Sequence, residues 1–104
     1  DWLNKGARNN KVYFGRKQGD AIYTGITKQP KNVRLSQYNN AGKGFDDLVI
    51  LYDGLTRNQA RAIEQYFIEN GPNALNKINS IAQNNIYYNY ALDWARKYLG
   101  IVEW

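Results

Sequence analysis

The segment of residues 10–28 constrains the fold most, because its pattern predicts a β-hairpin. Apolar and polar residues alternate over 11–17 and again over 21–27, which is typical of half-buried strands. Residues 18–20, with the sequence Gln-Gly-Asp, favour a tight turn between the two stretches. Strands joined by so short a turn pair antiparallel, so the hairpin begins a sheet.

Each strand carries a tyrosine followed two residues later by a glycine, in Tyr13-x-Gly15 and Tyr23-x-Gly25. Residues two apart share a strand face, so each glycine lies on the same face as its tyrosine. Glycine at these positions leaves room for another backbone or for a phosphate, whereas plain packing and a β-bulge are the ordinary alternatives. The opposite face is expected to form the core through Val12, Phe14, Ile22 and Ile26.

The rest of the chain predicts one further strand and three helices. The continuous apolar run over 48–52 is typical of a central strand covered on both faces. Thr56 and Gln59 have the spacing of a capping box, which opens a helix. The expected elements are a helix over 30–39, a strand over 48–52, a helix over 56–70, a loop over 73–85, and a last helix over 86–99 with Ile86, Tyr87, Tyr90, Ala91, Trp94 and Tyr98 on its apolar face.

This ββαβα order plus a C-terminal helix predicts a single α/β (α+β) domain over residues 1–104, with its core region over 11–80. The expected architecture is a three-stranded sheet, at least partly antiparallel, flanked by helices. A chain of 104 residues suffices for one domain with one modest core. Because no run approaches about 18 consecutive apolar residues, we expect no membrane anchor.

Composition restricts the possible chemistry, because the chain contains no cysteine and no histidine. Disulfides, thiolate zinc sites and catalytic triads that use histidine are therefore excluded, and catalysis would depend on Tyr, Lys, Asp, Glu, a metal or bound water. The 14 Lys and Arg against 9 Asp and Glu give a formal net charge of +5, which favours polyanionic partners. Methionine and a secretory leader are also absent, so we expect a domain processed or excised from a longer protein.

Glu64 lies within or at the edge of the apolar stripe of the 56–70 helix. A carboxylate near a core needs a partner or a cation. Glu64 is therefore either a metal ligand facing a cleft or a side chain that reaches solvent or pairs with Arg57 or Arg61.

Arg34 and Tyr38 stand four residues apart on the first helix and so share a face. The guanidinium fork matches the geometry of a phosphate, although a solvated surface charge is the ordinary alternative. Asn76 offers an amide in a loop, where it is either a site residue or a simple turn residue.

In order and spacing, these positions resemble the GIY-YIG nuclease superfamily, which is named for two short tyrosine motifs on adjacent strands. The resemblance covers about residues 11–80 and agrees with the ββαβα order read from periodicity. The matching positions are Lys11-Val12-Tyr13, Tyr23-Thr24-Gly25, Arg34, Tyr38, Ala60 with Glu64, and Leu75-Asn76-Lys77.

The chain departs from the family pattern at Lys11, Thr24 and Ile26, where members usually have Gly, Ile and Lys. The sequence therefore leaves open which Lys or Arg side chain would assist the phosphate. The candidates for nucleic-acid contact are Gly15, Arg16, Gly25, Lys28 and Lys43.

The resemblance implies phosphodiester hydrolysis with one divalent metal, Mg²⁺ or Mn²⁺. Glu64 would hold the metal and Arg34 would stabilise the transition-state charge. Tyr23, favoured over Tyr13, would orient or deprotonate the attacking water, and Tyr38 and Asn76 would complete the catalytic set. A tyrosine is a poor base at neutral pH unless nearby cations lower its pKa from about 10.

The resemblance also suggests a bacterial toxin effector domain of the contact-dependent inhibition type. Such a domain would be delivered as part of a larger secreted protein, act in the target-cell cytoplasm, and be neutralised by a cognate immunity protein, plausibly acidic. DNA is favoured over RNA as substrate. The alternatives are a tRNA-cleaving RNase, a repair or restriction nuclease domain, a non-catalytic nucleic-acid-binding module, and a protein that binds anionic surfaces or acts as a scaffold.

Overall fold

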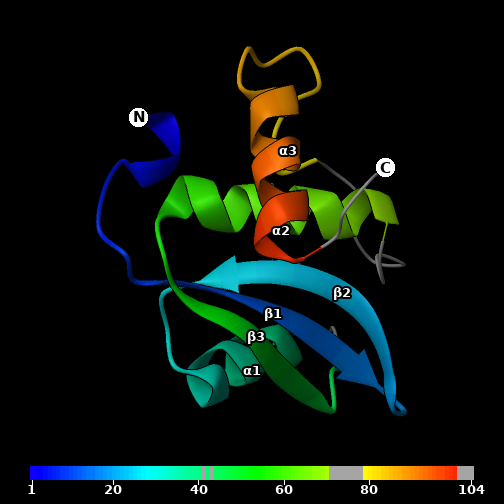
Figure 1. Ribbon diagram of the computed structural model, residues 1–104. Helices are drawn as coiled ribbons and strands as arrows, with labels where there is room; N and C mark the ends of the chain where they lie inside the picture. The colour runs from blue at the N-terminus through cyan, green and yellow to red at the C-terminus, as the bar shows by residue number, and fades with distance from the viewer. Residues whose placement is uncertain (41, 43, 71–78, 101–104) are drawn as a thin grey trace.

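The chain folds into a small antiparallel sheet with helices on both faces (Figure 1). The computed structural model describes residues 1–40, 42, 44–70 and 79–100. The predicted ββαβα order with an additional C-terminal helix is confirmed. The elements are the 3₁₀ helix η1 (Trp2–Asn4), β1 (Asn10–Lys17), β2 (Asp20–Thr27), α1 (Lys31–Asn40), β3 (Asp47–Leu55), α2 (Arg57–Asn70) and α3 (Tyr88–Tyr98).

The sheet has the strand order β2-β1-β3, with both pairs antiparallel. β1 is therefore the central strand, and the prediction that residues 48–52 form the central strand was wrong. The expected cover on both faces is nevertheless present, because Leu48 and Ile50 of β3 pack on one face while Leu51 and Tyr52 pack on the other. The apolar run over 48–52 shows that both faces of β3 are covered, and an edge strand can be covered on both faces as well as a central one.

Two apolar clusters lie on opposite faces of the sheet. The larger one joins Val12 and Leu55 to α2, α3 and η1, and includes the fully buried Ile63, Ile81 and Ala91. The smaller one, on the α1 side, consists of Tyr13, Tyr38, Phe45 and Leu48. Figure 1 shows the same arrangement, with α1 on one side of the sheet and α2 and α3 on the other.

The hairpin turn forms as expected, but its strands are bulged. Gln18 and Gly19 have φ of 54° and 84°, and a two-residue turn with positive φ suits the twist of a hairpin. Gly15 pairs with Tyr23 and Arg16 with Ala21, so Ile22 is the extra residue of a β-bulge. Ile22 consequently packs against the cluster that contains Tyr13, and the prediction that it shares the Val12 face was wrong.

The capping box at the start of α2 is confirmed. The Thr56 amide donates to Gln59 Oε1 at 3.0 Å, and the Gln59 amide donates to Thr56 Oγ1 at 3.2 Å. The Thr56 hydroxyl also donates to the carbonyl of Leu3, which ties η1 to the first turn of α2.

The last helix is shorter than expected, and its buried face differs. Residue 86 precedes the helix, so Ile86 is 87% exposed, and Tyr90 is 48% exposed on the outer side. Ala91, Leu92 and Ala95 form the buried face instead. The prediction that Ile86 and Tyr90 belong to the packed face was therefore wrong, and Tyr87 and Tyr98 are also partly exposed, at 37% and 45%. The expected loop over 73–85 lies partly outside the described residues.

Candidate active site

Three tyrosine hydroxyls meet on the α1 side of the sheet. Tyr13 and Tyr23 come from the paired strands β1 and β2, and Tyr38 comes from α1. The hydroxyls of Tyr13 and Tyr38 share a short hydrogen bond, and Tyr38 Oη donates to Tyr23 Oη at 3.3 Å. The three rings also contact one another, with centroid separations of 6.4, 6.1 and 5.6 Å. We call Tyr13, Tyr23 and Tyr38 the tyrosine cluster.

Arg34 binds the tyrosine cluster from one helical turn before Tyr38. Its Nη2 donates to Tyr38 Oη at 3.1 Å and its Nε to Tyr13 Oη at 3.5 Å, while its carbon Cζ lies 4.6 Å from the centre of the Tyr38 ring. Burial acts to lower the pKa of Arg34, but its contacts with Tyr13 and Tyr38 outweigh that effect and raise the pKa. Arg34 is therefore a fixed, permanently charged group beside the hydroxyls.

The two glycines that follow the tyrosines make room for protein side chains. A Cβ at Gly25 would lie 2.3 Å from Tyr13 Oη, and a Cβ at Gly15 would lie 2.9 Å from the ring of Phe45. The prediction that these glycines leave open space for a phosphate was therefore wrong, since that space is filled. The phenol of Tyr13 can lie flat across β2 only because residue 25 has no side chain.

Exposure separates the two candidate catalytic tyrosines. Tyr13 is 0% exposed, whereas Tyr23 is half-buried and can meet a substrate. Burial and the hydrogen bond with Tyr38 raise the pKa of both phenols well above the ordinary value. Both hydroxyls are therefore protonated at neutral pH, and Tyr23 is the more accessible of the two.

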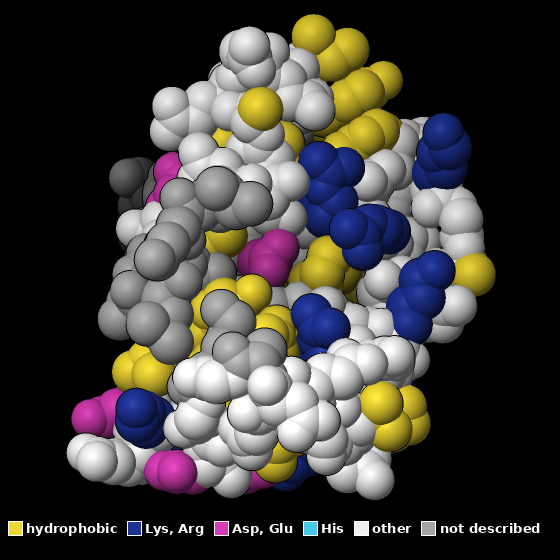
Figure 2. Space-filling view, turned by 180° about the vertical axis from the view of Figure 1, so that it is seen from behind, with side chains coloured by type: hydrophobic (Ala, Val, Ile, Leu, Met, Phe, Trp, Pro, Cys, Tyr) yellow, Lys and Arg dark blue, Asp and Glu magenta, His cyan; other side chains and the backbone are white. Residues whose placement is uncertain are grey.

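Glu64 lies on α2, half-buried, close enough to the tyrosine cluster for its charge to contribute to the raised pKa of Tyr23. Burial raises the pKa of Glu64, although a hydrogen bond with Ser80 and the charges of Arg57 and Arg61 act to lower it. Arg61 does not serve as its dedicated partner, because its donors bind the carbonyl of Ser80 and the side chain of Asn58. On the face seen in Figure 2, acidic surface lies beside a group of basic side chains.

Glu64 is the acidic side chain that the predicted site offers to a metal ion. Within the described ranges, no three carboxylate, histidine or cysteine side chains gather into a metal-binding group. One carboxylate completed by water and phosphate oxygens is nevertheless a usual arrangement for Mg²⁺. Glu64 fits this role, because its burial cost is only partly offset by its neighbours and a cation would offset the rest.

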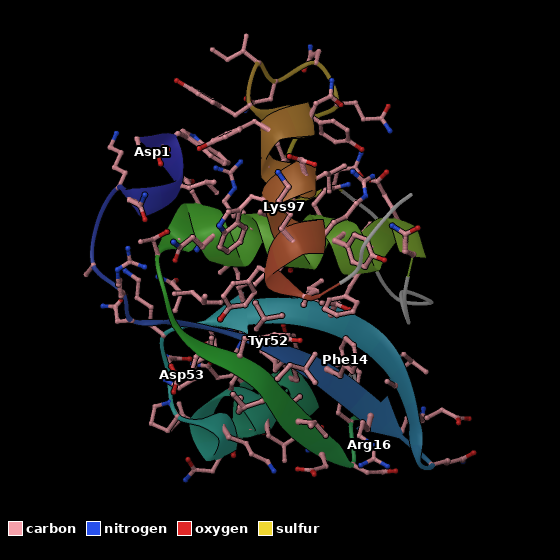
Figure 3. All side chains as sticks on the ribbon, in the orientation of Figure 1. Asp1, Phe14, Arg16, Tyr52, Asp53 and Lys97 are labelled. Carbon is pink, nitrogen blue, oxygen red and sulfur yellow. The ribbon has the colours of Figure 1, made fainter. Side chains whose placement is uncertain are left out.

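Of the remaining predicted site residues, the structure describes Arg16 and Lys28. Arg16 sits near the hairpin turn, where its Nη2 donates to the Gly19 carbonyl at 3.1 Å (Figure 3). Lys28 lines a pocket together with Arg57. Asn76 and Lys43 lie outside the described residues.

Sequence reasoning missed Phe45, whose ring packs on Tyr23 and Tyr38 with centroid separations of 5.7 and 5.2 Å. An aromatic residue just before a strand carries no pattern that would have placed it there. No helix in the described parts of the chain has the length and apolar character needed to cross a membrane.

Comparisons with protein families, with curated proteins and with solved structures found no match to this chain. The function is therefore inferred from the residues of the site and their geometry.

Proposed function

We propose that the protein is a metal-dependent endonuclease that hydrolyses phosphodiester bonds, with DNA as the favoured substrate. One observation supports this most: Tyr23 of β2, Arg34 of α1 and Glu64 of α2 form a single electrostatically linked group. Tyr23 is joined to Arg34 through Tyr38 by hydrogen bonds, and the charge of Glu64 adds to burial and Tyr38 in raising the pKa of Tyr23. Such a group combines a hydroxyl, a fixed cation and a partly buried carboxylate, which can orient a water, stabilise phosphate charge and hold a metal ion.

Arg34 would bind the phosphate and stabilise the charge that develops on it. Its guanidinium has five N–H donors. The tyrosine cluster orients it before any substrate arrives, through its bonds to Tyr13 and Tyr38. Pre-oriented donors of this kind stabilise a transition state without reorganising during the reaction.

Tyr23 would position the attacking water through its protonated hydroxyl. Its raised pKa makes it a poor general base in this state. Tyr13, which is buried, would act through Tyr38 and Arg34 as a positioning residue. A divalent cation held by Glu64 would stabilise negative charge on the leaving oxygen.

A cleavage assay tests this proposal. Supercoiled plasmid and total tRNA are incubated with the wild type, Glu64→Ala or Tyr23→Phe, each with Mg²⁺ or with EDTA. Cleavage that requires Mg²⁺ and is lost in both variants is expected, and the substrate that is cut decides between DNA and RNA. Absence of cleavage of either substrate, or cleavage that survives Glu64→Ala, would contradict the proposal and favour a non-catalytic nucleic-acid-binding module.

The role of a delivered toxin domain remains part of the same proposal and rests on the resemblance described above. The excess of Lys and Arg over Asp and Glu gives the chain a net charge of +5, which would complement the charge of an acidic immunity protein. Growth arrest on expression inside bacterial cells, lost in Glu64→Ala, is the expected result. Normal growth with a soluble, active protein would contradict this role.

A further inference from the structure

A small basic pocket lies at the N-terminal end of α2, the helix that carries Glu64. It has a volume of about 180 Å³, smaller than the roughly 300 Å³ at which pockets for drug-sized ligands begin. Lys5, Lys28 and Arg57 supply its charged side chains, and the segment around Gly6 and Asn10 supplies the rest of its wall. No carboxylate lines the pocket within the described part of the chain. Its size and charge suit a small anionic group.

The N-terminal wall of this pocket is fixed to α2. Arg8 Nη1 donates to Gln59 Oε1 at 3.2 Å, and Asn58 Nδ2 donates to the Trp2 carbonyl at 2.9 Å. Together with the bond from Thr56 to Leu3, these contacts hold the segment that carries Lys5 against the start of α2. The three cations are thus brought together by the fold from distant parts of the sequence.

Asn10 provides an independent sign that the pocket receives a ligand. Its side chain is 2% exposed, and its Nδ2 donates to Asn9 Oδ1 at 3.2 Å and to the Leu55 carbonyl at 3.4 Å. Its Oδ1, however, has no hydrogen-bond partner among the described residues. A buried acceptor without a donor is rare and costly, so it is expected where a donor arrives with a ligand or its water.

Arg57 connects the pocket with the candidate active site. It lines the pocket, and it lies about two helical turns before Glu64 on the same face of α2. A group bound in the pocket would therefore lie roughly 10 Å along α2 from Glu64. Lys28 directly follows the last residue of β2, the strand that carries Tyr23.

We propose that this pocket binds one backbone phosphate of the nucleic-acid strand, next to the phosphate that is cut. The inference rests on the proposed nuclease function. Phosphate oxygens would accept from Lys5, Lys28 and Arg57. A phosphodiester has no donor of its own, so Asn10 Oδ1 would accept from a water that also donates to a phosphate oxygen. This pocket would fix the register of the strand across Arg34 and Glu64.

Equilibrium binding tests the proposal separately from cleavage. A fluorescein-labelled DNA duplex, with the matching RNA as a second probe, is titrated by fluorescence anisotropy in EDTA at several salt concentrations. The proteins are Glu64→Gln, which serves as a parent that does not cut, and the same parent carrying Lys5→Ala and Lys28→Ala. The matched control is the parent with Lys97→Ala, which also removes a cation, from α3 (Figure 3). Thermal unfolding of every variant establishes that it is folded.

The pocket variant should bind several-fold more weakly than the control, and the slope of log K against log salt should fall by about 1. Affinity and slope equal to those of the Lys97→Ala control would overturn the pocket proposal. If the wild type does not cut but the pocket variant loses affinity, only the nuclease proposal fails. If the wild type cuts but the pocket variant binds nucleic acid like the control, only the pocket proposal fails. If neither DNA nor RNA binds to any of the proteins, both proposals fail.

Discussion

Replacing Gly25 by alanine should destabilise the fold, because the added methyl group would occupy space that Tyr13 fills. The new Cβ would lie 2.3 Å from Tyr13 Oη, 2.5 Å from Tyr13 Cζ and 2.9 Å from Tyr23 Cε2. Relieving such contacts requires a ring shift of about 1 Å to reach ordinary separations near 3.5 Å. Tyr13 is 0% exposed and its hydroxyl is bonded to Tyr38 and Arg34, so that shift strains the packing and weakens these bonds.

Overpacking costs about 1–3 kcal/mol and a weakened buried hydrogen bond about 1 kcal/mol, so the expected loss is about 2–4 kcal/mol. For a domain of this size, that corresponds to a melting temperature at least about 8 °C lower. Urea and thermal unfolding followed by circular dichroism would measure both quantities. Gly15→Ala is the matched comparison, and it should cost less, because its nearest contacts would be with the ring of Phe45, at 2.9 Å and beyond.

A second background tests the cause of the destabilisation. In Tyr13→Leu, the shorter side chain ends before the position of the phenol oxygen, so the contact with Tyr23 Cε2 at 2.9 Å remains but those with the phenol are gone. Adding Gly25→Ala should therefore cost much less than in the wild type. The two substitutions would then be strongly non-additive, as expected for residues in contact. An equal cost of Gly25→Ala in both backgrounds, or wild-type stability of the single variant, would refute this explanation.

Three further substitutions test separate parts of the structure. Glu64→Gln should raise the melting temperature at neutral pH. Burial raises the pKa of Glu64 above its ordinary 4.5, so the stability of the wild type falls as the pH rises past that value. A gain in melting temperature that is the same at about pH 4 and about pH 7 would contradict this explanation. Tyr13→Phe removes a buried hydroxyl and should lower the free energy of unfolding by about 1–2 kcal/mol. Tyr23→Phe should lower the free energy of unfolding less than Tyr13→Phe but reduce the cleavage rate more. The reverse order of the two variants in unfolding and cleavage assays would exclude the assigned roles. Thr56→Ala should lower the free energy of unfolding by about 1–2 kcal/mol in urea titrations, because it removes the cap of α2 and the tie to Leu3, and an unchanged value would count against both contacts.

Local patterns predicted the elements of this fold well. Alternation over 10–28 predicted the hairpin, and the Thr56 and Gln59 spacing predicted the first turn of α2. The shared face of Tyr13 and Tyr23 followed from the period of a strand, and the shared face of Arg34 and Tyr38 from the period of a helix. These relations depend on residues close in sequence, which is why they could be read directly.

The arrangement of the elements was less accessible. That β1 lies between β2 and β3 depends on pairing between distant segments, and an apolar run such as 48–52 reports only that both faces are covered. The bulge at Ile22 moved one side chain to the other face, which alternation alone cannot show. Nor did any pattern predict that Tyr13 would be fully buried across Gly25, or that Lys5 would come to lie near Lys28 and Arg57.

The most direct test of the proposed nuclease function compares cleavage by two variants of the same helix. Glu64→Gln and Glu69→Gln each replace one glutamate of α2 by its uncharged isostere. Glu69 is exposed and binds Tyr88 and Gln65. With Mg²⁺ present, Glu64→Gln should lower the cleavage rate by at least about 100-fold, because a metal ligand contributes several kcal/mol to the transition state, while Glu69→Gln should cut at close to the wild-type rate. Equal rates for the two variants would contradict the assignment of Glu64 and with it the proposed reaction.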